Sequence, residues 1–255
     1  MATRINRTGA GVARSGLVLL GCLAVAWGVG AMRLARGQSG LQDLASRIVD
    51  GEPYKLETIL ARLPQIEAVE ASPICRASAL HSVAVIRLRL VEEVMAAGRR
   101  DMIDDALERL HDTLRASLSC SPADPFLWLA LFWVENTRNG FSADHFKYLR
   151  LSYRLGPNEG WIALKRAHVA LALLQALPDD LRERTIGEFV KLVDDQLYTQ
   201  AAAILTGPGW PVRDLLLARL ASSAQRDREG FARVLKVKGY DVQVPGVVDR
   251  ERPYR

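Results

Sequence analysis

An uncharged, apolar run near the N-terminus constrains this chain more than any other feature of its sequence. From Ser15 to Met32, eighteen residues pass without a charged side chain, and Arg14 and Arg33 enclose them. A helix of that length rises about 27 Å at about 1.5 Å per residue, and the hydrocarbon core of a bilayer is about 30 Å thick. The run therefore predicts a transmembrane signal anchor over residues 15–33, with a cytoplasmic N-terminus over residues 1–14.

A cleaved secretory signal and a buried helix of a cytosolic protein are the alternatives to the anchor. The A-x-A triplet at residues 24–26 lies inside the apolar run, so cleavage there leaves a hydrophobic segment shorter than a span needs. Three arginines precede the run and two follow it closely, which slightly favours a cytoplasmic N-terminus. The anchor interpretation then places the C-terminal domain outside the cytoplasm.

The charge of the chain is concentrated in this N-terminal segment. All five charged residues among the first 40 are arginines, and the rest of the chain holds 29 basic and 29 acidic residues. A nucleic-acid-binding protein carries its basic excess on the folded domain. The balanced count therefore argues against a nucleic-acid partner.

Beyond the apolar run, hydrophobic residues recur with the helical period, and no segment alternates as a strand would. The sequence predicts an all-α protein, with short helices and a connector over 34–73, one helical domain over 74–240 and a flexible tail over 241–255. Helices are predicted over 41–49, 53–63, 76–97, 100–119, 125–139, 143–155, 161–176, 179–205, 212–224 and 227–236. Residues 65–73 are predicted as a connector, and the helix over 179–205 has a candidate break near Asp194.

Two of the three cysteines lie outside the apolar run and flank one predicted helical hairpin. Cys75 precedes the helix over 76–97, and Cys120 follows the helix over 100–119. If these helices are antiparallel, both thiols fall at the same end of the hairpin, within reach of a disulfide. The alternative is a pair of buried free thiols that pack as small apolar side chains.

The helix predicted after Pro125 is apolar on every side through residues 126–134. Such a helix has to be surrounded, so it is expected to form the centre of the domain core. The alternative is a surface that inserts into a bilayer or receives a partner helix.

Two junctions in the middle of the chain resemble each other at a spacing close to 34 residues. Each places a serine near a helix end, a proline in the turn and a tryptophan near the next helix start: Ser117, Pro122 and Trp128, then Ser152, Pro157 and Trp161. This pattern is similar to tetratricopeptide repeats, which stack 34-residue helical hairpins. Phe132 and Lys165 depart from it, because the repeat prefers small residues there. The resemblance covers about residues 100–177.

Three short runs also resemble a group of small, single-span, repeat-like proteins associated with bacterial exopolysaccharide biosynthesis. They are Asp124–Leu129, Leu155–Trp161 and Gly207–Pro211. The resemblance implies a role in polysaccharide assembly or export without implying a reaction. Together with the anchor, it predicts a single-pass protein of the bacterial inner membrane with a periplasmic C-terminal domain.

Catalytic signatures are weak throughout the sequence. The four histidines, at positions 81, 111, 145 and 168, are too far apart to share a helical metal site, and phosphate-binding and acyl-transfer motifs are lacking. Neighbouring acids occur at 92–93, 104–105, 179–180 and 194–195, where they are expected to cap helices or face solvent. The sequence predicts no metal site and no cofactor.

One charged face is a candidate binding groove. Lys147, Arg150 and Arg154 recur at helical spacing, and the next predicted helix carries Trp161, Lys165 and Arg166. In a stack of hairpins these six residues are predicted to line a groove for an acidic polysaccharide or an acidic partner segment. The alternative is a solvated face balanced by nearby acids.

The preferred hypothesis is a non-catalytic, membrane-tethered helical scaffold that acts in exopolysaccharide assembly or export through contacts with protein partners. A further possibility is a chaperone-like module for the assembly of other envelope proteins, which would have the same helical scaffold and would differ only in the protein it binds. The alternative from another class is a glycan-active lyase or hydrolase, which needs two carboxylates facing one cleft.

Overall fold

The computed structural model describes the backbone of residues 7–248 and the side chains of residues 16–28 and 40–248. Its regular elements are all helices, and no strand occurs within residues 7–248, which confirms the all-α class. The chain divides into two compact units, residues 1–120 and 121–255. The boundary between Cys120 and Ser121 falls inside the single domain that was predicted over 74–240.

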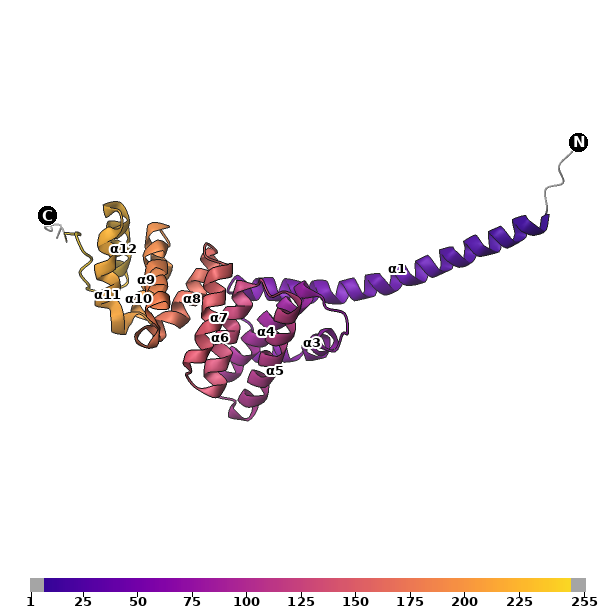
Figure 1. Ribbon diagram of the computed structural model, residues 1–255, viewed down its shortest axis with the longest axis horizontal. Coiled ribbons are helices and arrows are strands. Elements are labelled where there is room, and N and C mark those ends of the chain that lie inside the picture. The colour runs from indigo at the N-terminus through magenta and orange to yellow at the C-terminus, as the bar shows by residue number, and fades with distance from the viewer. Residues whose placement is uncertain (1–6, 249–255) are drawn as a thin grey trace, which may run out of the picture. The chain divides into compact units, whose positions relative to one another are not determined.

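The first unit begins with one continuous helix, α1 (Arg7–Val49), rather than an anchor followed by a separate helix over 41–49 (Figure 1). Gly40 does not end the helix, because a single glycine weakens a helix by only about 1 kcal/mol relative to alanine. The C-terminal part of α1 buries Leu41, Leu44 and Ala45 and packs on α4 (Ala77–Ala96).

The structure corrects the predicted membrane anchor over 15–33. Within the described part of the chain, none of the helices is both long enough and apolar enough to span a membrane. The single-pass inner-membrane localisation is corrected with the anchor. The N-terminus predicted over 1–14 and the end of the anchor over 29–33 lie outside the described side chains.

Two short helices, α2 (Leu56–Leu60) and α3 (Leu63–Glu70), follow α1 and place Ile59 and Ile66 in the core. The helix predicted over 53–63 ends just before Pro64, but Pro64 lies in the first turn of α3. Proline is tolerated there because the first-turn N–H groups have no partner within the helix. The prediction of a connector over 65–73 is therefore wrong for most of that segment.

Helices α4 and α5 (Arg100–Cys120) form the predicted hairpin, and Gly98 makes the turn with φ +65° (Figure 1). A disulfide joins Cys75 to Cys120 across the open end, with their Cα atoms 5.9 Å apart. The predicted disulfide is thus confirmed.

The disulfide gives a direct chemical test. Alkylation of the denatured, non-reduced chain is expected to label Cys22 alone, because the other two thiols are bonded to each other. Mass spectrometry should find one adduct before reduction and three after it. Three adducts before reduction would show that the bond does not form.

The second unit runs from α6 (Pro125–Asn139) and α7 (Phe146–Leu155) through α8 (Gly160–Ala172) and α9 (Asp179–Asp194) (Figure 1). It continues with α10 (Tyr198–Thr206), α11 (Arg213–Arg219) and α12 (Gln225–Val237). Single 3-10 turns lie between them: η1 (Ala143–His145), η2 (Leu174–Ala176), η3 (Trp210–Val212) and η4 (Leu220–Ser222). The segment over 179–205 breaks after Asp194, where Gln196 takes φ 63°.

Helix α6 forms the core of the second unit, as its all-round apolar sequence predicts. Leu127, Phe132 and Val134 are fully buried, and Leu129 and Leu131 are nearly so. The Asp124 side chain caps the helix by accepting hydrogen bonds from the Phe126 and Leu127 amides. The alternative of a bilayer-inserting face is overturned by this burial.

The chain after α12 docks on the second unit instead of forming the flexible tail predicted over 241–255. Val244 is 2% exposed, and the Pro245 carbonyl accepts a 2.6 Å hydrogen bond from the Arg228 guanidinium. Val244 is the buried apolar residue of this segment, whereas Val248 is 81% exposed. Residues 249–255 lie outside the described part of the chain.

Candidate functional site

The residues of the predicted basic groove have different environments in the structure. On α7, Arg150 forms a two-pronged ion pair with Asp180 at the start of α9, at 2.8 and 2.9 Å. The hydrogen bonds from Arg150 lower the pKa of the Asp180 carboxyl. Lys147 lies over its neighbour Tyr148, with Nζ 5.0 Å from the ring centroid. The charge of Arg150 is thus already balanced by a local acid.

Arg166 was predicted to face a groove, but it is fully buried. Its guanidinium donates to the Glu188 carboxylate on α9, to the backbone and hydroxyl oxygens of Ser152, and to the Gly156 carbonyl. Arg166 is buried because its face of α8 packs toward α7 and α9, where the Glu188 carboxylate pairs with the guanidinium. Arg166 is part of the core of the second unit.

The other predicted groove residues remain at the surface. Arg154 and Lys165 are exposed, and neither pairs with an acid in the part of the chain that is described. Trp161 is 39% exposed and packs against Phe126, with ring centroids 5.2 Å apart. The acidic-polymer groove stays a prediction that rests on four exposed cations instead of five, and one of the four, Arg150, is paired with Asp180.

A polar network surrounds Arg166 in the core. The Tyr153 hydroxyl donates to Glu188 at 3.2 Å and lies 3.1 Å from the Thr185 hydroxyl, while the Tyr153 ring stacks 4.2 Å below the guanidinium. Burial raises the pKa of Glu188 and of Tyr153; the ion pair with Arg166 opposes the shift of Glu188. The network is enclosed, so it joins helices and offers no access to a substrate.

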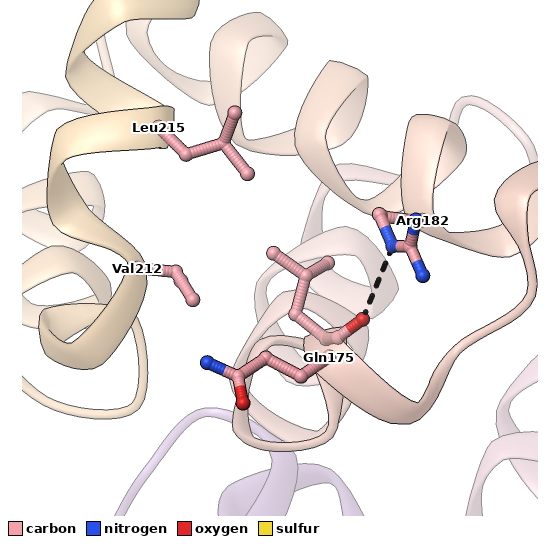
Figure 2. Close-up of a pocket in the computed structure, with 5 residues that line it drawn as sticks. Gln175, Arg182, Val212 and Leu215 are labelled. Carbon is pink, nitrogen blue, oxygen red and sulfur yellow. Dashed lines mark hydrogen bonds between the residues drawn. The ribbon is translucent and has the colours of Figure 1, made fainter.

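The candidate site is an open pocket of about 340 Å³ in the second unit (Figure 2). Leu174 and Gln175 of η2, Arg182 of α9, Val212 of η3 and Leu215 of α11 line it. In Figure 2 the side chains of Val212 and Leu215 lie on one side of the pocket and that of Arg182 on the other. The lining is aliphatic apart from one amide and one guanidinium.

Arg182 is held in place at the edge of this pocket by neighbouring oxygens. Its Nη2 donates to the Leu177 carbonyl at 2.9 Å, its Nη1 to Asp179 at 2.9 Å, and its Nε to the Leu174 carbonyl at 3.5 Å (Figure 2). Leu174 begins η2 and Leu177 caps its end, so the arginine bridges both ends of that turn. A fixed cation beside aliphatic side chains suits a ligand that is part apolar and part anionic.

The pocket lacks the parts of an active site for glycan cleavage. None of its five lining residues is a carboxylate or a nucleophile, and among the described residues no group of three or more His, Cys, Asp or Glu is placed to hold a metal ion. The sequence reasoning missed this pocket because its residues come from four elements, 174 to 215, that carry no shared motif. The run Gly207–Pro211, one of the three runs in which the sequence resembles exopolysaccharide-associated proteins, ends next to Val212 of the pocket.

Comparison with known proteins adds no assignment: no family model, curated protein or solved structure matches the chain.

Proposed function

We propose that this protein is a non-catalytic helical scaffold that binds protein partners and acts in exopolysaccharide assembly or export. The polysaccharide context comes from the resemblance of three short runs, and the scaffold from the packing of the second unit. One observation is the main support for the scaffold. Side-chain hydrogen bonds in this unit recur between residues whose separation in sequence is about the length of one helical hairpin.

These contacts form a regular series. Arg150 with Asp180, Tyr153 with Thr185, and Glu183 with Arg219 are hydrogen-bonded at separations of 30, 32 and 36 residues. Lys191 with Asn158 and Tyr198 with Asp227 add pairs at 33 and 29 residues. In a solenoid each hairpin contacts its neighbours, so contacts cluster at one repeat length. The series supports a tetratricopeptide-like stack.

The junction residues support the same proposal. Ser117 and Ser152 are both fully buried, as expected for small residues that close the second helix of a repeat. A side chain at Gly156 would come within 2.7 Å of Pro125, so the end of α7 and the start of α6 approach closely within their hairpin. Proteins built this way bind partners along an extended surface and need no catalytic group.

Genetic complementation distinguishes the scaffold from an enzyme. Deleting the gene is expected to lower exopolysaccharide yield, and a doubly substituted chain, Asp194→Asn with Asp195→Asn, is expected to restore it fully. The same holds for Glu92→Gln with Glu93→Gln. Phe132→Ala, which damages the core, serves as the negative control.

Two results would overturn the proposal. An unchanged polysaccharide yield after deletion removes the polysaccharide role. A folded carboxylate variant that fails to restore the yield, although it still co-purifies with the same proteins as the unchanged chain, points to catalysis.

A further inference from the structure

We infer that the pocket lined by Leu174, Gln175, Arg182, Val212 and Leu215 binds the C-terminal residue of a partner protein, when that residue is aliphatic. The inference deepens the proposed scaffold function by naming the chemistry that one of its contact sites recognises. It rests on three properties of the pocket: its size, its aliphatic walls and its fixed guanidinium.

The aliphatic walls of the pocket suit an apolar side chain, and its volume leaves room for the end of a peptide. At about 340 Å³ it lies near the lower limit for small-molecule sites. Of its lining residues, Leu174 is buried and Leu215 leaves 43% of its surface exposed. Trp210, two residues before Val212, is 36% exposed as well. Exposed apolar side chains gathered on one turn mark an interaction surface.

Arg182 gives the pocket its preference for an anion. A guanidinium has five N–H groups, and the three hydrogen bonds of Arg182 use one on each nitrogen. One N–H on each terminal nitrogen therefore has no partner among the described residues. Its only acidic partner there, Asp179, has a side chain that is 92% exposed, and such ion pairs contribute little. A ligand carboxylate can therefore join or displace it.

The pocket combines the Arg182 guanidinium with an aliphatic wall, and this combination favours the C-terminus of a protein chain as the ligand. Arg182 and Leu215 line the same pocket, so a ligand that contacts both has to carry its carboxylate close to its aliphatic group. Within a polypeptide chain, a main-chain carboxylate and a side chain are attached to the same Cα only in the C-terminal residue. Gln175 supplies an amide that can bond the preceding peptide group. An internal acidic residue would need a second residue to fill the aliphatic part.

Fluorescence anisotropy with the full-length protein tests the inference. The probe is a labelled hexapeptide, Gly-Ser-Gly-Ser-Ala-Leu, with a free C-terminal carboxylate. Blocking the carboxylate as an amide, or replacing the final leucine with lysine, is expected to weaken binding at least tenfold. An otherwise identical peptide with an internal Leu-Glu pair and an amidated end is also expected to bind at least tenfold more weakly.

Variants of the protein locate the site. Arg182→Gln and Leu215→Asp are each expected to weaken binding of the free-acid peptide at least tenfold. Arg184→Gln is the matched control, since Arg184 is an exposed arginine on the same helix and does not line the pocket. Leu215→Asp changes an exposed side chain, so it tests the site even if Arg182→Gln disturbs the turn at η2.

Several outcomes would overturn the inference. They are the absence of binding by the free-acid peptide, equal binding of the amidated peptide, and equal effects of Arg184→Gln and Arg182→Gln. Failure here is distinguishable from failure of the scaffold proposal: if Leu215→Asp leaves complementation and the co-purifying proteins unchanged, the scaffold stands and its contacts lie elsewhere.

Discussion

Replacing Arg166 with alanine is expected to lower the free energy of unfolding of the second unit by about 3 to 5 kcal/mol. Arg166 is fully buried, and its removal leaves the Glu188 carboxylate in the core without its cationic partner. It also removes the donor to the Ser152 and Gly156 carbonyls, which holds the end of α7 against α8. Urea unfolding followed by tryptophan fluorescence and circular dichroism measures the change.

Two further variants separate a buried ion pair from general sensitivity of the fold. Arg154→Ala, at an exposed arginine on α7, is expected to change stability by no more than about 0.5 kcal/mol. Combining Arg166→Met with Glu188→Leu is expected to recover part of the loss, because an apolar pair leaves no buried charge uncompensated. A loss below about 1 kcal/mol for Arg166→Ala would contradict the buried network.

Phe132→Ala is expected to destabilise the second unit by about 3 to 5 kcal/mol, through lost apolar contact and the cavity left behind. Phe132 is fully buried at the middle of α6, and its ring lies 6.4 Å from that of Phe146 on α7. The same urea titration gives the change in midpoint.

The control for this core position is Arg138→Ala, an exposed site near the end of α6 that is expected to be nearly neutral. Phe132→Leu fills most of the space and is expected to lose much less stability than Phe132→Ala. Equal effects of the leucine and alanine variants would show that the site is not tightly packed.

The helices that the sequence located well are those with strong end signals. Pro125 and Gly140 bracket α6, and the predicted range of 125–139 is the observed one, because proline starts a helix readily and glycine ends it. Pro64 shows the limit of the same reasoning. The predicted helix over 53–63 ends just before it, yet Pro64 lies in the first turn of α3. Proline is compatible with either role, and the packing around Ile66 decides between them.

The candidate site was harder to predict because it depends on contacts distant in sequence. Arginine is mostly exposed in proteins, so nothing local marked Arg166 as buried; its partner Glu188 lies 22 residues away on another helix. The pocket likewise joins Leu174 to Leu215 through the packing of η2, α9 and α11. Helical period identifies which residues share one face of a helix, but it does not identify which helix meets that face.

The disulfide described in the first unit also limits how far this chain can be stretched. Cys120 is the last residue before the second unit, so a pulling force applied at the two ends passes through the sulfur atoms and bypasses the 45-residue segment back to Cys75. That segment would otherwise add roughly 150 Å to the extended length, at about 3.5 Å per residue. The hairpin of α4 and α5 is therefore shielded from mechanical load while the cross-link is intact.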